Sequence, residues 1–251
     1  MPEAPPPSPE VVALGSAVLS RYGRVVHDFE INHLDRIPAD KPALLIFYHG
    51  FMPLDVWLFG AEVHRQTGRT IRFLADRFLF KTPGLRRLVK LTGAVPGNRP
   101  DAVRMLNEGH LVGVSPGGVR EALAGRDEHY RVIWGQRRGF AHVAIEAKVP
   151  IIPIFTENVE EIYRAPGADS APVQALYERT RIPIVPIVGL GALPIPVKLR
   201  AWVGEPIPHD PEDTAEVLRD KAHDALQGLI DAHQYTGQRR ILHALRERIG
   251  R

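Results

Sequence analysis

The sequence predicts an α/β protein with a single domain, in which a largely parallel central sheet is flanked by helices. Short apolar runs alternate with amphipathic helical patterns along the whole chain. The length of 251 residues suits one large domain, and no linker or internal repeat divides the chain. Hydrophobic residues make up 44% of the sequence and charged residues 24%, which is typical of a globular protein rather than a disordered one.

Local patterns predict each element in turn. The continuous apolar run ALLIFY at residues 43–48 predicts a buried strand, and apolar residues at helical spacing predict amphipathic helices. In the first half we expect a helix at 11–26, an edge strand at 28–31, strands at 43–48 and 70–75, a helix at 55–66 and a basic helix at 83–92. In the second half we expect a helix capped by Asn98 or Asp101 and ending at Gly109, a strand at 111–115, a helix at 137–148, an irregular or edge strand at 150–155 because of its prolines, a helix at 171–181, strands at 184–188 and 197–203, and helices at 211–232 and 238–249.

These elements divide the chain into three segments. A Pro-rich N-terminus at residues 1–10 is expected to be disordered, residues 11–235 form the main domain, and residues 236–251 form a basic C-terminal helix or tail. The sequence has no cysteine, which excludes disulfides, a thiol nucleophile and Cys-ligated zinc. No cluster of metal ligands is evident, so we expect no metal and no resident cofactor.

Charge and hydropathy indicate which surfaces the protein contacts. The formal net charge of +3 is too small to indicate nucleic-acid binding. No secretory signal and no run of about 18 apolar residues is present, so we expect a cytoplasmic protein whose membrane contact is peripheral. Basic residues cluster in one stretch, which is either a solvated face or a surface for anionic lipid headgroups or a phosphate-bearing cofactor: Arg72, Arg77, Lys81, Arg86, Arg87, Lys90, Arg99 and Arg104.

The first candidate for chemistry is the segment YHGFMPLD, which contains His49 and Asp55. His49 follows a buried strand, and ligands bind at strand ends in open α/β sheets. A turn bent by Gly50 and Pro53 can return the Asp55 carboxylate to the imidazole, which would fix its tautomer and make it a general base. The alternative is that His49 is a turn residue and Asp55 only caps a helix.

A second candidate is the segment GVSPGGVRE, which spells the G-x-S-x-G pattern of a serine hydrolase at Ser115. In that fold the residue after the nucleophile donates its backbone N–H to the oxyanion, and Pro116 has none. The paired glycines Gly117 and Gly118 instead let the backbone approach a ligand, and Arg120 adds a positive charge. Such turns are also common without a ligand.

A third candidate is Gly97-Asn98-Arg99, which precedes a predicted helix. It is either a helix cap with a surface arginine or a phosphate contact.

Together these segments resemble the glycerolipid acyltransferases. The four blocks read YHGFMPLD, GAVPGNR, SPGGVRE and KVPIIPI, in order and within residues 48–154. The branch related to type-2 diacylglycerol acyltransferases is the most similar, through SPGGVREAL and RRGFAHVAIEAKVPIIPIF. The resemblance implies His49 as base and Asp55 as its orienting partner.

It also implies that Arg99 and Arg120 are polar contacts to the substrate. We add Asn98, Gly117, Gly118 and Glu121 as candidate substrate-binding residues; Glu121 matches an acid of that branch whose role the resemblance does not give.

Two departures from the family pattern bear on the substrate. Five residues separate His49 from Asp55, where most of the superfamily has four. The third block has lost the glutamate of Pro-Glu-Gly-Thr-Arg, which favours a neutral acceptor such as diacylglycerol over lysophosphatidate. The resemblance therefore predicts transfer of a fatty acyl group from acyl-CoA, or from an acyl carrier protein, to a lipid hydroxyl. The alternatives are a lysophosphatidate acyltransferase, a serine hydrolase at Ser115 and a non-catalytic lipid-binding module.

Overall fold

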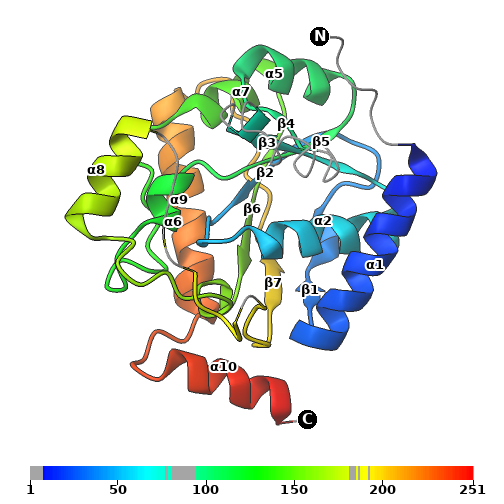
Figure 1. Ribbon diagram of the computed structural model, residues 1–251. Coiled ribbons are helices and arrows are strands. Elements are labelled where there is room, and N and C mark those ends of the chain that lie inside the picture. Colours follow the sequence, from blue (N-terminus) through cyan, green and yellow to red (C-terminus); the bar gives the residue numbers. More distant parts are fainter. Residues whose placement is uncertain are drawn as a thin grey trace.

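The computed structural model describes residues 8–76, 79–80, 94–180, 185, 187–191 and 193–250. Its strands form one sheet in the order β1-β7-β6-β2-β5-β3-β4 (Figure 1). Neighbouring strands run parallel except for β6 and β7, so the predicted single α/β domain with a largely parallel sheet is confirmed. The strands are β1 Glu30–Asn32, β2 Ala43–Phe47, β3 Ile71–Ala75, β4 Val95–Pro96, β5 Leu111–Val114, β6 Ile151–Thr156 and β7 Arg200–Val203.

Helices cover both faces of this sheet (Figure 1). On one face α1 packs against α2, and on the other α5, α7 and α9 pack side by side, with α9 also contacting β6. The described helices are α1 Pro9–His27, α2 Leu54–Thr67, α5 Arg99–Asn107, α6 Val119–Ala122, α7 Gly139–Ala147, α8 Ala171–Thr180, α9 Ala215–His233 and α10 Arg240–Ile249, with short 3-10 turns η1 Leu34–Arg36 and η2 Val159–Glu161.

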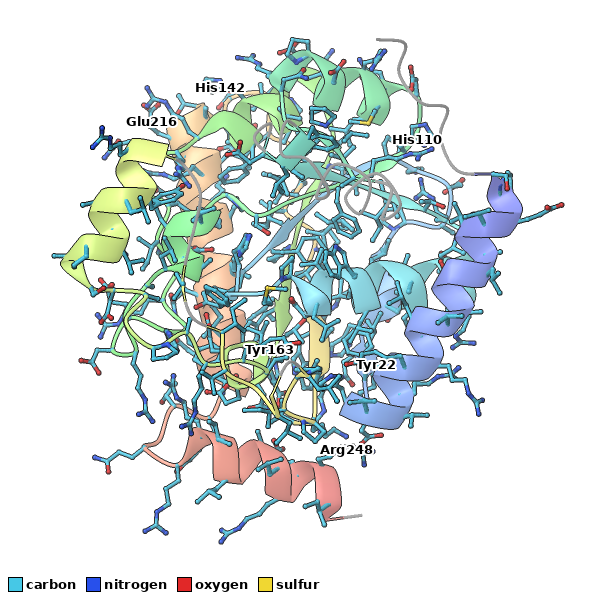
Figure 2. The ribbon with its side chains drawn as sticks, viewed as in Figure 1. Tyr22, His110, His142, Tyr163, Glu216 and Arg248 are labelled. Atoms are coloured by element: carbon cyan, nitrogen blue, oxygen red, sulfur yellow. The ribbon has the colours of Figure 1, made fainter. Side chains whose placement is uncertain are left out.

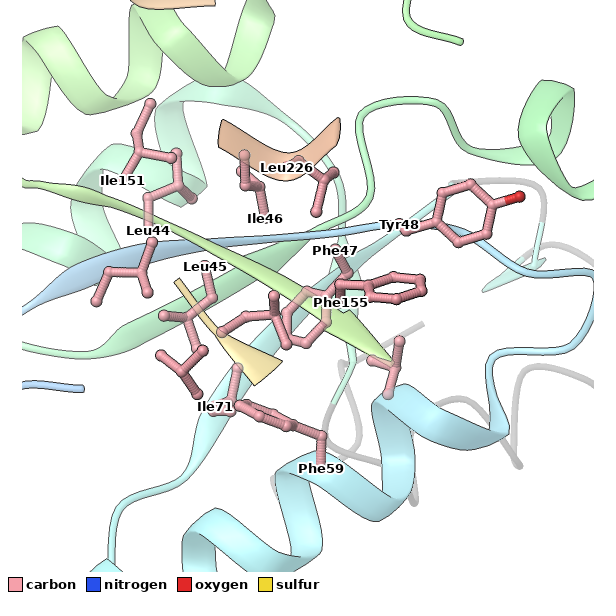
Figure 3. Close-up of a cluster of buried hydrophobic side chains, with 14 of the residues drawn as sticks. Leu44, Leu45, Ile46, Phe47, Tyr48, Phe59, Ile71, Ile151, Phe155 and Leu226 are labelled. Atoms are coloured by element: carbon pink, nitrogen blue, oxygen red, sulfur yellow. The ribbon is translucent and has the colours of Figure 1, made fainter. Parts of the chain in front are cut away.

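Strand β2 lies at the centre of the core. All five of its residues are buried, because helices cover it on both faces and β5 and β6 flank it. Ile46 lies beneath Leu226 of α9, whereas the Phe47 ring meets Phe59 of α2 edge-on at 5.4 Å (Figure 3). The carboxyl end of β2, where His49 follows, is therefore held by a strand on each edge and by helix side chains on each face.

Strand β6 is an interior strand, so the prediction of an irregular or edge position was wrong. It pairs with β2 on one side and β7 on the other. The carbonyl of Pro153 faces Gly204, and the ring nitrogen, which carries no N–H, points to the same side. Strand β7 ends at Val203, just before Gly204, so the proline is tolerated at this position. Gly204 N donates to Pro153 O at 2.8 Å, and a Cβ at Gly204 would lie 2.6 Å from the Pro153 ring.

The N-terminal segment expected to be disordered, residues 1–10, overlaps the start of the first helix. Residues 1–7 lie outside the described part of the chain, but Pro9 and Glu10 already belong to α1. The helix starts early because the Ser8 side chain accepts from Val11 N and proline occupies the first turn.

Two further predictions fall on segments that are not fully described. The basic helix expected at 83–92 lies outside the described residues, as does most of the basic stretch. Of the strand expected at 184–188, Val188 forms an isolated bridge with Arg164.

The predicted C-terminal helix corresponds to α10, which packs against the domain. Its Ala244 is fully buried, and Arg248 donates hydrogen bonds to Val25 O and Val26 O at the end of α1 (Figure 2). Among the described helices, none is long and apolar enough to span a membrane.

Candidate active site

The carboxyl ends of three adjacent strands meet at one edge of the sheet. Because β2 pairs in parallel with both β5 and β6, the segments that follow these strands lie next to one another. His49 follows β2, Pro116-Gly117-Gly118 follows β5, and Thr156 ends β6. The fold therefore brings two of the predicted blocks together.

His49 is held in one orientation by its own turn. Its Nδ1 lies 2.6 Å from Gly50 O, and since a carbonyl only accepts, Nδ1 must carry a proton. Burial lowers the pKa of His49, although the Gly50 carbonyl opposes this shift. The neutral imidazole therefore has its lone pair on Nε2, which is the form that a general base requires.

A glycine is needed beside this histidine. A Cβ at Gly50 would lie 2.7 Å from Val159 Cγ2 on η2, so only the absence of a side chain lets the turn pass this close. The sequence predicted Gly50 as a bend, and the structure adds that it is also a packing contact.

Glu121 joins the His49 turn to the glycine turn. Its side chain is buried, with 1% exposed, and its carboxylate accepts from His49 N at 3.1 Å and from Ile133 N at 2.9 Å. Burial raises the pKa of Glu121 to about 7, against the effect of these two N–H groups and of Arg137. Glu121 therefore positions His49, a role that the sequence left unassigned.

Gly117 and Gly118 are required for different reasons. A Cβ at Gly117 would lie 1.9 Å from Glu121 Cδ, so the carboxyl group occupies the space of that missing side chain. Gly118 precedes α6 with φ +56° and ψ −145°, a conformation that favours glycine. The pair thus permits both the turn and the inward position of Glu121.

Arg137 fixes the same turn and was not predicted. Its Nη1 donates to Pro116 O at 3.0 Å and also to Gly117 O. It belongs to the RRGF run, which supported the family resemblance but gave no role to this side chain. The contact joins residues 20 positions apart, so local spacing did not reveal it.

Asp55 does not hydrogen-bond to His49 among the described residues, so the expected contact is not formed. It lies in the first turn of α2, after the cap residue Pro53, and is 3% exposed. Burial raises the pKa of Asp55 to about 7, and its Oδ1 has no hydrogen-bond partner within the described residues. The Thr156 hydroxyl lies near the carboxyl group without hydrogen-bonding it. The catalytic roles of His49 and Asp55 stay predictions.

A buried polar cluster holds Tyr48, the residue that precedes His49. Tyr48, the residue before His49, donates to Glu160 Oε1 at 2.7 Å and accepts from Tyr130 N at 2.9 Å. Tyr130 in turn donates to Glu161, which is paired with Arg240 at 3.3 Å. Burial raises the pKa of Glu160 to about 8, despite the hydrogen bond from Tyr48. These contacts join distant parts of the chain, and sequence reasoning missed them.

The remaining predicted residues lie on the surface or serve as caps. Asn98 caps α5 by accepting from Asp101 N at 2.8 Å, and Arg99 is paired with Glu146 of α7 at 2.7 Å. Arg120 is exposed on α6. No hydrogen bond or ion pair within the described part of the chain joins these three to His49 or Glu121. Their assignment to substrate stays a prediction.

A cavity of about 400 Å³ lies beside the His49 turn. Phe51 of that turn forms part of its wall, together with residues after α6, the η2 region and the start of α10. Tyr163, another wall residue, lies near the end of the molecule that α10 covers (Figure 2). Among the described residues, no group of three or more His, Asp or Glu could hold a metal ion.

Comparison with known proteins gives a consistent result. The family model described as "Acyltransferase" matches residues 28–157, which include His49, Asp55 and the glycine turn. The human "DGAT1/2-independent enzyme synthesizing storage lipids" is 48% identical over 213 residues, covering 85% of this chain and 64% of that protein. The chicken protein of the same description is 47% identical over 227 residues, covering 90% of this chain and 66% of its own length.

Among solved structures, the 1-acyl-sn-glycerophosphate (LPA) acyltransferase PlsC from Thermotoga maritima has the same fold. Its TM-score is 0.59 at 16% sequence identity, covering 90% of this chain and 79% of that chain. This likeness concerns the fold alone. The chain spans about two thirds or less of the curated relatives that it matches.

Proposed function

Because the chain belongs to the acyltransferase family, we propose that it transfers a fatty acyl group from acyl-CoA to the hydroxyl of a glycerolipid, with His49 as general base. The observation that carries the proposal is the state of His49. Its Nδ1 is directed at Gly50 O, its backbone N–H is held by Glu121, and burial keeps the ring neutral. A buried imidazole fixed in this way presents Nε2 as a proton acceptor.

The proposed reaction proceeds in one transfer. The acceptor hydroxyl gives its proton to His49 Nε2 while its oxygen attacks the thioester carbonyl. The thiolate then leaves and takes the proton back from the imidazolium, so that an ester and a free thiol are formed. The backbone N–H groups of Gly117 and Gly118 donate to no described residue, which makes them candidates to hold the oxyanion.

Asp55 is proposed to stabilise the imidazolium. Its carboxyl group is buried in the first turn of α2, the helix that follows the His49 turn, and its Oδ1 is unpartnered among the described residues. When His49 becomes positive, the charge would favour the ionised form of Asp55 and attract it. The predicted dyad would then form during the reaction rather than before it.

A neutral acceptor such as diacylglycerol is favoured by two observations. Gly117 stands where the family block Pro-Glu-Gly-Thr-Arg has its glutamate, and the human relative is described as synthesizing storage lipids. We further propose that an acyl carrier protein is the alternative donor. We also propose that the protein is cytoplasmic and reaches its lipid acceptor through peripheral contact with the membrane surface.

Acylation of defined acceptors tests the proposal. Labelled acyl-CoA is supplied with diacylglycerol, monoacylglycerol or lysophosphatidate in turn, and the wild type is compared with His49→Ala. Removing a general base is expected to lower kcat by about 10²–10⁴-fold. His142→Ala is the matched control, since His142 lies on α7, away from the His49 turn (Figure 2), and should leave kcat unchanged.

Two outcomes would contradict this function. Loss of activity in Ser115→Ala with activity retained in His49→Ala would indicate a serine hydrolase. Binding of lipid without turnover in the wild type, for all three acceptors, would indicate a non-catalytic lipid-binding module.

A further inference from the structure

The cavity beside the His49 turn is lined by three arginines from three separate segments. Arg126 follows α6, Arg164 follows η2, and Arg240 begins α10. The arginines predicted from sequence, Arg99 and Arg120, do not line it. Positive charge therefore gathers at a place that no motif indicated.

Two of these three arginines are available to a ligand. Arg240 is paired with Glu161, and its guanidinium lies 5.4 Å from the centre of the Tyr130 ring, so it supports the buried cluster. Arg126 is exposed and makes one long hydrogen bond, 3.5 Å to Gln238 O. The exposed Arg164 side chain makes no hydrogen bond or ion pair within the described part of the chain. Among the residues that the structure describes, no acidic side chain therefore pairs directly with either of these two arginines.

The acids of the cavity wall compensate these charges only in part. Glu160 accepts from Tyr48, and burial raises its pKa to about 8, so it is mostly neutral at pH 7. Glu161 is occupied by Tyr130 and Arg240. Burial lowers the pKa of His129 to about 4, and so this wall residue is neutral. Asp169 remains as the exposed acid, which leaves an excess of positive charge.

The rest of the wall is apolar and adjoins the proposed catalytic turn. Phe51, Ala122, Ala165 and Ile241 contribute aliphatic or aromatic surface. Phe51 lies two residues after His49, and Glu160 holds Tyr48, which precedes His49. A ligand in this cavity would thus contact the same segment that carries the base.

We propose that this cavity binds the phosphate group of a substrate, with Arg126 and Arg164 as its cationic contacts. Planar guanidinium groups form charge-assisted hydrogen bonds to phosphate oxygens, and the apolar wall accommodates the carbon skeleton attached to the phosphate. The proposal rests on the proposed function in treating the ligand as a substrate. The phosphate belongs either to a phosphorylated lipid acceptor or to the nucleotide part of the acyl donor.

Direct binding to the full chain, without turnover, tests the cavity separately from the reaction. Two ligand pairs isolate the phosphate: lysophosphatidate against monoacylglycerol, and coenzyme A against pantetheine, each titrated calorimetrically. The variant Arg126→Ala/Arg164→Ala is compared with Arg21→Ala/Arg24→Ala, which removes two exposed arginines from α1. All four side chains are exposed, so folding should be preserved.

The cavity variant is expected to bind one of the two phosphorylated ligands about tenfold more weakly or worse. The α1 variant should bind like the wild type, and Asp169→Asn should bind more tightly. Weakened lysophosphatidate binding identifies the acceptor as the source of the phosphate, and weakened coenzyme A binding identifies the donor.

The proposal is overturned if both phosphorylated ligands bind the cavity variant as tightly as the wild type, or if neither binds the wild type. Arginine-dependent binding without acyl transfer would contradict the proposed function and leave the cavity proposal standing. Acyl transfer in which ligand binding does not depend on Arg126 and Arg164 would support the proposed function and contradict the cavity proposal.

Discussion

Two buried glutamates in different regions of the molecule have pKa values that are shifted in opposite directions. Glu121 beside His49 is 1% exposed and Glu62 between α1 and α2 is 4% exposed, yet the pKa of Glu121 is raised to about 7 and that of Glu62 is lowered to about 2. Burial raises both pKa values. For Glu62 the hydrogen bonds from Arg65, Ser20 and Gln66 outweigh it.

The difference lies in the partners. Glu121 accepts backbone N–H groups from two distant segments and has Arg137 only nearby, so its charge is poorly compensated but its position fixes His49. Glu62 is paired with a cation at 2.5 Å and fixes how α1 packs on α2. Burial alone therefore does not distinguish a residue that positions a reactive group from one that holds two helices together.

The largest expected effect is that of Glu121→Ala. The partly buried N–H groups of His49 and Ile133 would lose their acceptor at about 1–2 kcal/mol each, so the free energy of unfolding should fall by about 2–4 kcal/mol. His49 would also shift, and kcat should fall by about a hundredfold. Urea denaturation and steady-state acylation measure the two effects. Glu121→Gln keeps one acceptor oxygen and should be intermediate; wild-type kcat in Glu121→Ala would refute the positioning role.

A smaller loss of stability is expected when a side chain at position 117 takes the space that the Glu121 carboxyl group occupies. Gly117→Ala places a Cβ 1.9 Å from Glu121 Cδ, which should displace the carboxyl group and destabilise the protein by about 1–3 kcal/mol. Gly139→Ala is the matched control, because no atom lies within 4 Å of its new Cβ and it begins α7. It should be neutral or slightly stabilising in thermal denaturation. Equal destabilisation by both substitutions would show that the Glu121 contact is unimportant.

At the other glutamate, Ser20→Ala should change stability without changing catalysis. It removes one donor to Glu62 but leaves Arg65 and Gln66 in place, so a loss of about 1 kcal/mol is expected. The kcat of the folded protein should equal that of the wild type. A fall in kcat comparable to that of Glu121→Ala would mean that the two regions are coupled and the comparison is invalid.

The smallest expected effect is the change that one substitution makes to the pH dependence of stability. Between pH 4.5 and about 7 the folded protein keeps a proton on Glu121 that the unfolded chain has lost, so this group stabilises less as pH rises. Glu62 acts in the opposite sense, since its contribution is lost as pH falls from 4.5 through about 2. Denaturation of Glu121→Gln between pH 5 and about 7 should show a smaller decline than the wild type. An unchanged slope would contradict the raised pKa.

The sequence predicted the parts of the site that depend on local pattern. An apolar run followed by His-Gly placed His49 at a strand end, and Pro-Gly-Gly placed a turn after the next strand. The roles of Glu121 and Arg137 could not be predicted, because their partners are distant in sequence and are brought near by sheet order. Pro153 misled for a related reason: its effect depended on where the neighbouring strand ended.

The central position of β2 also affects how the chain reaches its native state. Its two neighbours, β5 and β6, begin at Leu111 and Ile151, so a ribosome must add more than a hundred residues after Ala43 before both edges of β2 can pair. Until then the segment ALLIF is an apolar strand with open edges, which is the type of sequence that associates with other chains. The His49 turn thus follows a strand whose edges stay open until late in synthesis, and folding is expected to be slow because the contacts of β2 with β5 and β6 are remote in sequence.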